Sequence, residues 1–468
     1  MIIEQIYTGC LAQGAYYIES NGEVAIVDPL REVQDYIDKA NENNAKIKYI
    51  FETHFHADFV SGHVTLAEKT GAKIVYGPTA KTNFEAITAQ DNQVFKVGDI
   101  TIKVLHTPGH TMESACYLLK DKEGKNHALF SGDTLFLGDV GRPDLAQKGD
   151  ITEKDLAGFL YESLQTKIMP LEDDVIVYPA HGAGSACGKN LSKETIGTIG
   201  EQKKTNYALR ADMTKEEFIK EVTDGLLPPP AYFPLNVKLN KEGYKDVDDI
   251  IKNSAKPLSV KDFELIANET NALILDVRHQ DEFVKGFIPQ SIFIGINGGF
   301  APWVGALIKD ILQPILLIAP VGKEEDTITR LSRVGFDNVL GYLDGSFDSW
   351  KKANKEIDSI DSISAATLQQ KIAHKQPVFD VRKPGEYDSE HIKVAENTPL
   401  DFLNDYIEKF PKSDNFYIHC AGGYRSVIAA SILKARGFHN VVDIAGGFAA
   451  IKNTDIERTD AVCPSTLK

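Results

Sequence analysis

The sequence predicts an α/β protein of three domains, and three observations lead to this prediction. The chain has 468 residues, which at roughly 150 residues per domain suggests about three domains. Apolar strand-like runs alternate with segments in which apolar residues recur at helical spacing. Residues 258–355 and residues 361–460 also share one layout, which indicates an internal repeat.

Composition narrows the class of protein. Hydrophobic residues make up 43% and charged residues 25% of the chain, as in ordinary soluble globular proteins. The net charge of -16 argues against nucleic acid or an anionic membrane as the main partner, although a small anionic ligand needs only a local basic pocket. With no run of 18 apolar residues, no membrane span is expected, and the start, Met1 to Gln5, lacks the features of a signal peptide.

Cysteine usage indicates the redox compartment. The five cysteines are odd in number and scattered along the chain, at Cys10, Cys116, Cys187, Cys420 and Cys463. Such a pattern suits reduced thiols in a cytoplasm better than a disulfide framework. Cys10, Cys116 and Cys463 have no local motif and are expected to be structural.

The first region, residues 1–225, is expected to begin with a β-hairpin. Strand-like runs at residues 16–19 and 24–28 flank Asn21-Gly22, a strong hairpin turn signal. A helix is expected over residues 33–40 and another near residues 61–70. Further strands are predicted at residues 48–52, 73–76, 101–105, 114–119, 127–130 and 175–178.

Four of these strands end in a turn that carries a histidine or an aspartate. The turns contain His54, His56 and Asp58 after the first strand, His110 after the second, Asp133 after the third and His181 after the fourth. Histidine and carboxylate together are typical metal ligands. One such segment alone also fits a polar loop with solvated histidines, but four of them predict a single site at one edge of a sheet.

These four segments resemble the signature loops of the metallo-β-lactamase fold, an αββα sandwich. They correspond to its THxHxD loop, its TPGHT-type loop, its GDT-type aspartate and its late histidine. The run from Phe130 to Asp144 is further similar to the persulfide dioxygenase branch, which includes mitochondrial sulfur dioxygenases. The resemblance implies one Fe(II) per chain, held by His54, His110 and Asp133, the facial triad of non-haem oxygenases. His56, Asp58 and His181 would then orient ligands and water.

One position departs from the general pattern of this fold. Dinuclear zinc hydrolases usually carry histidine directly after the aspartate of the first loop, where this chain has Phe59. A phenyl ring offers no lone pair, so a single metal is expected. Zinc also accepts two histidines and an aspartate, which leaves a zinc hydrolase of the glyoxalase II type, a thioesterase, as the alternative. With iron, the implied reaction is oxidation of a low-molecular-weight persulfide, RSSH, by O2 and water to sulfite and the thiol.

Two residues beyond these loops each have two interpretations. Arg142 lies close to Asp144 in sequence and forms either a structural ion pair with it, which is favoured, or a contact to substrate. Cys187 follows soon after His181 and is either a thiol relay near the metal or, as favoured, a small buried hydrophobic residue.

Residues 226–257 are predicted to be a linker. Pro228-Pro229-Pro230 and the nearby Pro234 argue against a helix or a central strand over residues 226–234. Three prolines in a row favour a stiff extended spacer, and the adjacent aromatic residues are expected to pack onto the first domain. A proline-rich partner motif is the alternative.

Residues 361–460 place a cysteine on a glycine-rich loop between a strand, residues 415–419, and a helix. The loop consists of Cys420, Ala421, Gly422, Gly423, Tyr424 and Arg425. Its backbone N–H groups, the helix N-terminus and the charge of Arg425 should favour a thiolate and a persulfide at Cys420. The Cys-x4-Arg-Ser spacing also fits a cysteine phosphatase. The six-residue loop and the preceding DVR, EY and HI segments, however, resemble the rhodanese family of sulfurtransferases. Ala421 stands where many rhodaneses have arginine, which leaves the sulfur donor and acceptor open.

Residues 258–355 repeat this layout without the cysteine. Residues 273–278 match residues 378–382, and residues 334–339 match residues 436–441. The corresponding loop, Ile318 to Lys323, contains no nucleophile, so we expect a catalytically inactive rhodanese-like domain that acts as a scaffold.

The whole arrangement resembles bacterial fusions of a persulfide dioxygenase with rhodanese modules. It implies that sulfite made in the first domain accepts sulfur from persulfidated Cys420, giving thiosulfate in a pathway of sulfide detoxification. The implied partners are a low-molecular-weight persulfide, O2, sulfite and thiosulfate, and the family suggests a homo-oligomer. The thiol that carries the persulfide stays open among glutathione, coenzyme A and bacillithiol. A non-enzymatic sulfur-responsive binding protein is a third possibility.

Overall fold

The computed structural model describes residues 1–147, 150–189, 191–372 and 376–462, so that Cys463 lies outside the described residues. The chain divides into two compact units, Met1–Ile250 with Ser332–Gly335, and Ile251–Leu331 with Phe336–Lys468. Among the helices that the structure describes, none combines the length and the apolar character needed to cross a bilayer.

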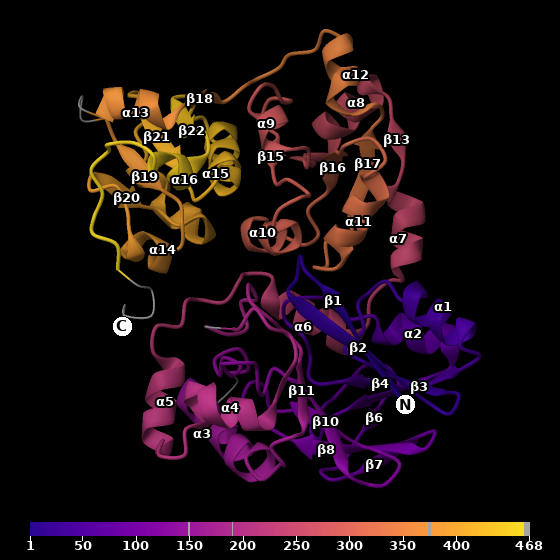
Figure 1. Ribbon diagram of the computed structural model, residues 1–468. Coiled ribbons are helices and arrows are strands. Elements are labelled where there is room, and N and C mark those ends of the chain that lie inside the picture. Colours follow the sequence, from indigo (N-terminus) through magenta and orange to yellow (C-terminus); the bar gives the residue numbers. More distant parts are fainter. Residues whose placement is uncertain (148–149, 190, 373–375, 463–468) are drawn as a thin grey trace. The chain divides into compact units, whose positions relative to one another are not determined.

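The first unit contains two six-stranded sheets (Figure 1). One sheet has the order β1 (Ile2–Thr8), β2 (Gln13–Ser20), β3 (Glu23–Val27), β4 (Lys46–Glu52), β5 (Lys73–Tyr76) and β6 (Ile87–Thr88). The other has the order β12 (Gly197–Thr198), β11 (Ile176–Pro179), β10 (Asn126–Gly132), β9 (Ala115–Lys120), β8 (Ile100–His106) and β7 (Val94–Val97).

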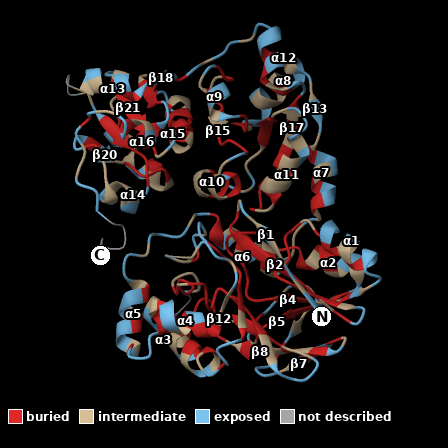
Figure 2. Ribbon diagram, viewed as in Figure 1, coloured by how far each residue is buried: buried red, intermediate tan, exposed pale blue. Residues whose placement is uncertain are grey.

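Alternate residues of the strands pack into different cores, because successive side chains of a strand point to opposite faces. Tyr16 and Val27 of the first sheet share a core with Tyr117 and Phe130 of the second sheet. The intervening residues, such as Tyr17, pack instead against the helices of their own outer face. Figure 2 shows the resulting buried centre of this unit. The two sheets are thus packed face to face.

Helices cover both outer faces of this sandwich. The first sheet is covered by α1 (Gln34–Glu42) and α2 (His63–Thr70), and the second by α3 (Glu153–Ser163), the π-helical turn η1 (Leu164–Ile168), α4 (Ile199–Thr205), the short 3₁₀ helix η2 (Tyr207–Leu209) and α5 (Lys215–Thr223). Thr152, Thr198 and Thr214 each form a capping box at a helix start, which satisfies N–H groups that have no partner within the helix. The layers are therefore those of the αββα sandwich predicted from the sequence.

The predicted hairpin of the first region is confirmed. Strands β2 and β3 are antiparallel and pair Ser20 with Glu23 across the turn. Asn21 and Gly22 have φ values of 46° and 75°, the left-handed pair that a tight hairpin turn requires.

The expectation of an extended spacer was wrong for the end of residues 226–234. Helix α6 (Phe233–Glu242) begins there and is followed by α7 (Val247–Ser254). Pro234 lies in the first turn of α6, where its missing N–H leaves no intrahelical bond unmade. The prolines therefore precede the helix or lie in its first turn and do not interrupt it, and the buried side chains of Tyr232 and Phe233 anchor its start.

The second unit contains two five-stranded parallel sheets with the same strand order. The first is β13 (Pro257–Leu258), β17 (Val339–Leu343), β16 (Ile315–Ile318), β14 (Leu273–Asp276) and β15 (Ile292–Phe293). The second is β18 (Asp361–Ile363), β22 (Val441–Ile444), β21 (Phe416–His419), β19 (Val378–Asp380) and β20 (Ala395–Asn397). The identical order is the structural form of the internal repeat seen in the sequence.

The helices of this unit follow the same repeat. The first sheet is accompanied by α8 (Val260–Thr270), α9 (Gln280–Phe283), α10 (Phe300–Leu307), α11 (Glu324–Ser332) and α12 (Ser346–Lys352). The second is accompanied by α13 (Ala365–Ile372), α14 (Pro384–Ser389), the 3₁₀ segment η3 (Leu400–Lys409), α15 (Tyr424–Ala435) and α16 (Gly447–Ile451). The predicted fold class, a sandwich followed by two α/β domains, is confirmed.

Candidate metal centre and cysteine loop

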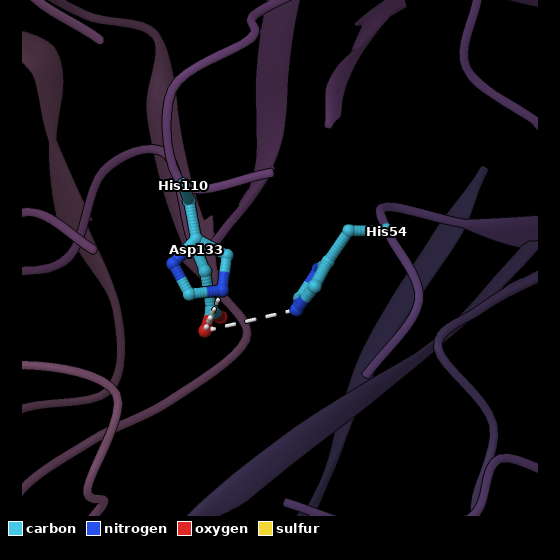
Figure 3. A group of neighbouring side chains, drawn as sticks. All are labelled: His54, His110 and Asp133. Atoms are coloured by element: carbon cyan, nitrogen blue, oxygen red, sulfur yellow. Dashed lines mark ion pairs between the residues drawn. The ribbon is translucent and has the colours of Figure 1, made fainter. Parts of the chain in front are cut away.

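Three buried side chains converge at the ends of strands in the first unit. His54 follows β4, His110 lies in the loop after β8, and Asp133 follows β10. Asp133 Oδ2 lies 3.8 Å from His54 Nε2 and 3.4 Å from His110 Nε2 (Figure 3). Each residue is at most 2% exposed. The sequence predicted that these three residues would meet, and the structure brings them together.

Hydrogen bonds orient both imidazoles toward this point. Nδ1 of His110 is 2.9 Å from the carbonyl oxygen of Arg142, which can only accept, so Nδ1 carries the proton and Nε2 keeps its lone pair. Nδ1 of His54 is 3.0 Å from Thr53 Oγ1, and Thr53 in turn donates from its N–H and its hydroxyl to Asp28. Burial, followed by the nearby imidazoles of His56, His110 and His181, holds the pKa of His54 well below its ordinary value. A neutral His54 can therefore also act as a ligand.

The donor atoms at this point fit a metal ion. His54 Nε2 and both carboxylate oxygens of Asp133 are buried and have no hydrogen-bond partner among the described residues. An isolated buried carboxylate is costly, and a cation would satisfy all three atoms together. Two imidazole nitrogens and one carboxylate oxygen suit Fe(II) and zinc alike.

A second group lies beside the first. Nε2 of His181 is 3.4 Å from Asp58 Oδ2 and 3.6 Å from Asp133 Oδ1. The potential ligand atoms of His56, Asp58 and His181 also lie within 4.8 Å of one another. The predicted neighbours of the metal site are therefore adjacent to Asp133.

His56 is tied to two carboxylates that the sequence did not single out. Its Nε2 lies 3.1 Å from Asp28 Oδ1 and 3.4 Å from Glu52 Oε2. Burial alone would lower the pKa of His56, but the charge of Asp28 and hydrogen bonds to Asp28 and Glu52 outweigh it and hold that pKa well above its ordinary value. In the sequence, Asp28 and Glu52 each end an apolar strand-like run. An acidic residue at a strand end needs no functional role, so this pattern did not single them out.

Phe59 occupies a closed part of the loop. It is fully buried, and its ring centroid lies 4.4 Å from that of His56. Asn240 of α6 donates from Nδ2 to the carbonyl oxygens of His56 and Phe59, at 2.8 Å each. Asn240 belongs to the predicted linker, so this segment supports the loop of the candidate metal site. The prolines of the segment gave no indication of this role.

A cavity of about 590 Å³ reaches His110. Its apolar wall includes Phe55, Met112, Leu145 and Val237, and its charged residues are Lys81, Lys241 and Glu113. Within the described part of the chain, neither lysine forms an ion pair. Two ammonium groups and one carboxylate give this mixed lining a net positive charge, which suits a small ligand that carries negative charge.

Arg142 and Cys187 lie close to the three residues. Arg142 makes a two-pronged ion pair with Asp144, with both N–O distances 2.7 Å, and donates to the carbonyl oxygens of Ala186 and Leu227. These contacts favour the structural interpretation of Arg142. The sulfur of Cys187 lies within 4.8 Å of ligand atoms of Asp133 and His181, while burial and then the charges of Asp133 and Asp58 raise its pKa. The position keeps the relay interpretation open, whereas the raised pKa favours an unreactive thiol.

In the second unit, Cys420 lies between β21 and α15 and is 1% exposed. The N–H of Gly423 donates to Cys420 Sγ at 3.1 Å, and Gly423 has a φ of 100°. This left-handed conformation turns the chain sharply and favours glycine. Arg425 donates to both carboxylate oxygens of Glu386 at 2.6 and 2.8 Å. Glu386 belongs to α14, so this ion pair fixes the position of the Arg425 guanidinium.

Comparisons with known proteins agree with this division. The metallo-beta-lactamase superfamily model matches residues 8–181, and the rhodanese-like domain model matches residues 259–353 and 364–454. A solved metallo-beta-lactamase from Staphylococcus aureus is 31% identical, with coverage of 73% of this chain and 98% of that chain and a TM-score of 0.64. The solved ETHE1 from Myxococcus xanthus is 28% identical, with coverage of 52% and 98% and a TM-score of 0.44.

Among curated proteins, the probable hydroxyacylglutathione hydrolase glo2 of Schizosaccharomyces pombe is 34% identical over 34% of this chain. The chain spans 58% of the length of that relative. The relatives differ in the activities that their names state, so the residues of the two sites carry the functional argument.

Proposed function

Because the chain belongs to the metallo-beta-lactamase superfamily and carries two rhodanese-like domains, we propose that it couples persulfide oxidation to sulfur transfer. In this proposal, the first domain converts RSSH, O2 and water to RSH, sulfite and two protons. Cys420 then passes sulfane sulfur to the sulfite and thiosulfate forms. The protein would work in the cytoplasm as a homo-oligomer and detoxify sulfide.

The observation that carries the proposal is the set of His54, His110 and Asp133 beside the buried Phe59. Two histidines and one carboxylate leave further coordination positions open, as in non-haem iron oxygenases. Phe59 stands where a dinuclear hydrolase of this fold would supply a further imidazole, so one ion per chain is the simpler occupancy.

Iron(II) held by these three residues would supply open coordination positions and electrons for the reaction of a sulfur anion with O2. The protein's own residues bind and orient the reactants. His181 and Asp58 lie next to Asp133 and can hold a water molecule and accept its protons. The apolar side chains of the cavity can contact the carrier thiol, while Lys81 and Lys241 attract its negative charge.

Sulfur transfer at Cys420 needs two balanced steps. RSSH and the Cys420 thiol exchange sulfur to give RSH and the Cys420 persulfide. Sulfite then attacks the outer sulfur, the S–S bond breaks, and thiosulfate leaves with the Cys420 thiolate restored. The N–H of Gly423 donates to the cysteine sulfur and stabilises its negative charge.

A zinc hydrolase of the glyoxalase II type is the second candidate. It is favoured by the group of His56, Asp58 and His181, whose atoms lie close enough to hold a further ion, and by the name of a curated relative. Two features weigh against it. Phe59 offers no ligand atom where a dinuclear site of this fold would have an imidazole, and the imidazole of His56 is engaged by Asp28 and Glu52.

Metal analysis together with O2 uptake tests the proposal. We expect one iron per chain, and O2 consumption on addition of glutathione, coenzyme A or bacillithiol persulfide that exceeds consumption with a neutral alkyl persulfide. His54→Ala should lose the iron and the O2 uptake, while thiosulfate:cyanide transfer at Cys420 continues at the wild-type rate. His127→Ala, on β10 outside the candidate site, is the matched control. Two zinc ions per chain and no O2 uptake with any persulfide would establish the hydrolase instead.

A further inference from the structure

The fifth residue of the Cys420 loop contacts the other rhodanese-like domain of the same compact unit. Tyr424 begins α15, and its hydroxyl donates to the carbonyl oxygen of Gly295 at 2.7 Å. Its ring lies 5.9 Å from that of Phe293, edge to face. The loop that carries the nucleophile is thereby attached to the domain that has none.

Two glycines make room for the Tyr424 ring. A Cβ added at Gly298 would lie 2.2 Å from Tyr424 Cζ and 2.6 Å from both Cε atoms. One added at Gly295 would lie 2.8 Å from Phe293 Cζ and 3.1 Å from Tyr424 Cε2. Gly298 does not adopt the left-handed conformation, so its backbone does not require glycine. The close approach of the ring is what excludes a side chain there. We call Gly295 and Gly298 the tyrosine seat.

The tyrosine seat is braced from within its own domain. Arg330 of α11 donates from Nη1 to the carbonyl oxygen of Ile296 at 2.9 Å and pairs with Asp326 at 2.8 Å. Ile296 lies between the two seat glycines in the sequence. The helix that follows the cysteine-free loop thus supports the segment that receives Tyr424.

Helix α15 contacts this domain at further points along its length. Ser431 Oγ accepts a hydrogen bond from the N–H of Phe293 at 3.0 Å. Lys434 donates at 2.7 Å to Asp358, which follows this domain in the chain and is hydrogen-bonded through its backbone to Phe287 of the domain. Figure 1 shows α15 beside β15, the strand that contains Phe293. Residues 424, 431 and 434 are seven and three residues apart, which places them on one face of the helix.

We infer that the middle rhodanese-like domain is a positioning partner of the Cys420 loop. Gly422 and Gly423 give this loop more conformational freedom than other residues would, and the Gly423 N–H must point at Cys420 Sγ to stabilise charge there. The tyrosine seat fixes the residue directly after Gly423, so that the loop is held in the binding geometry before a sulfur anion arrives. The inference rests on the proposed sulfur transfer at Cys420.

A set of variants isolates the tyrosine seat. Gly298→Ala places a methyl group inside the ring, whereas Gly299→Ala is the matched control, because a Cβ there would lie 3.4 Å from the nearest atom, Trp303 Cδ1. Tyr424→Ala removes the ring, and Tyr424→Phe keeps the ring while losing the bond to Gly295. The double variant Gly298→Ala/Tyr424→Ala removes the clash together with its partner.

Two measurements read out the effect. The first is hydrogen exchange of the amides of residues 421–425, and the second is kcat/KM for thiosulfate:cyanide transfer at 25 °C on protein shown to be folded. We expect about tenfold faster exchange and about tenfold lower kcat/KM for Gly298→Ala and Tyr424→Ala, and about threefold changes for Tyr424→Phe, the scale of one lost hydrogen bond. The double variant should match Tyr424→Ala, and Gly299→Ala should match wild type.

The outcomes separate this inference from the proposed function. A purely structural contact would lower the unfolding temperature and leave kcat/KM of the folded protein unchanged, which would overturn the inference. Unchanged loop exchange in Gly298→Ala would also overturn it. If wild type shows no sulfur transfer but loop exchange still follows the pattern above, the tyrosine seat stands and the proposed sulfur transfer fails.

Discussion

The two rhodanese-like domains share a scaffold and differ in their loops. Each has a five-stranded parallel sheet of the same order. In each, an arginine two residues after a buried aspartate pairs with it at 2.6 Å, as Arg278 with Asp276 and Arg382 with Asp380. Each guanidinium also lies over a phenylalanine ring. These buried contacts maintain the fold in both domains.

Even the turn of the loop is retained. Gly322 and Gly423 occupy equivalent positions, three residues after Ala319 and Cys420, with φ values of 83° and 100°. The two loops therefore share this backbone turn and differ in their side chains.

Three loop positions distinguish the domains. Ala319 stands in place of Cys420, the proposed nucleophile, and Glu324 stands in place of Arg425. Pro320 stands in place of Ala421 and has no N–H to donate. The first turn of α11 carries Glu324, Glu325 and Asp326, whereas the first turn of α15 has no acidic residue. Acidic groups there cancel the positive end of the helix dipole that would attract an anion. The comparison teaches that the residues that maintain this fold are not those of the proposed sulfur-transfer loop, so the loop can change while the fold stays the same.

Replacing the nucleophile gives the largest expected effect. Cys420→Ser should lower thiosulfate:cyanide transfer by about a thousandfold or more, because a hydroxyl at neutral pH cannot substitute for a thiolate. Cys10→Ser, in the first unit, is the control and should transfer sulfur at the wild-type rate. The measurement is thiocyanate formation. Transfer by the Cys420→Ser protein would mean that the middle domain is active after all, and the contrast between the domains would disappear.

Rebuilding the middle loop in the Cys420→Ser protein sharpens the comparison. Ala319→Cys alone should stay near the Cys420→Ser level, since the acidic first turn of α11 repels thiosulfate. Adding Glu324→Arg should raise thiocyanate formation by up to about tenfold, the scale of a charge change at a helix start. The Pro320 position still lacks a donor, so wild-type rates should not return. Full activity from Ala319→Cys alone would show that the missing thiol was the whole difference.

Patterns local in the sequence predicted much of this molecule. The Asn21-Gly22 hairpin depends on the conformations of two adjacent residues, and the site residues follow strands whose ends meet at one sheet edge. His54, His110 and Asp133 were therefore predictable as neighbours, although the metal that they would hold was not. The repeat between residues 258–355 and 361–460 predicted two similar sheets, and the two five-stranded sheets indeed have the same strand order.

Other features depend on contacts between residues distant in the sequence. Helix α6 forms despite the prolines before it, because Tyr232 and Phe233 are buried and Asn240 bonds to the loop of His56 and Phe59. The contacts of His56 with Asp28 and of Tyr424 with Gly295 likewise join segments whose approach no local pattern encodes. Tertiary packing decides such contacts.

The smallest expected effect concerns a buried carboxylate behind the Cys420 loop. Asp443 on β22 is 3% exposed, and the equivalent position on β17 is Tyr342. Burial raises the pKa of Asp443 from 3.8 to about 6, against hydrogen bonds that lower it. The folded state thus binds a proton more tightly than the unfolded chain. The favourable contribution of Asp443 is complete below pH 3.8 and is lost as the pH rises through about 6.

Asp443→Asn should therefore stabilise the C-terminal domain at neutral pH, since an amide carries no charge to bury. Between pH 5 and pH 7.5 the gain should grow by about 1 to 2 kcal/mol, as linkage requires for a group whose pKa is raised on folding. Hydrogen exchange of β21 and β22 in the full chain measures the opening free energy at each pH. Asp344→Asn, which changes an exposed carboxylate of the middle domain, should show no such growth. A gain independent of pH would mean that Asp443 stays charged in the folded protein, and the burial of that charge would then distinguish the two domains as sharply as their loops do.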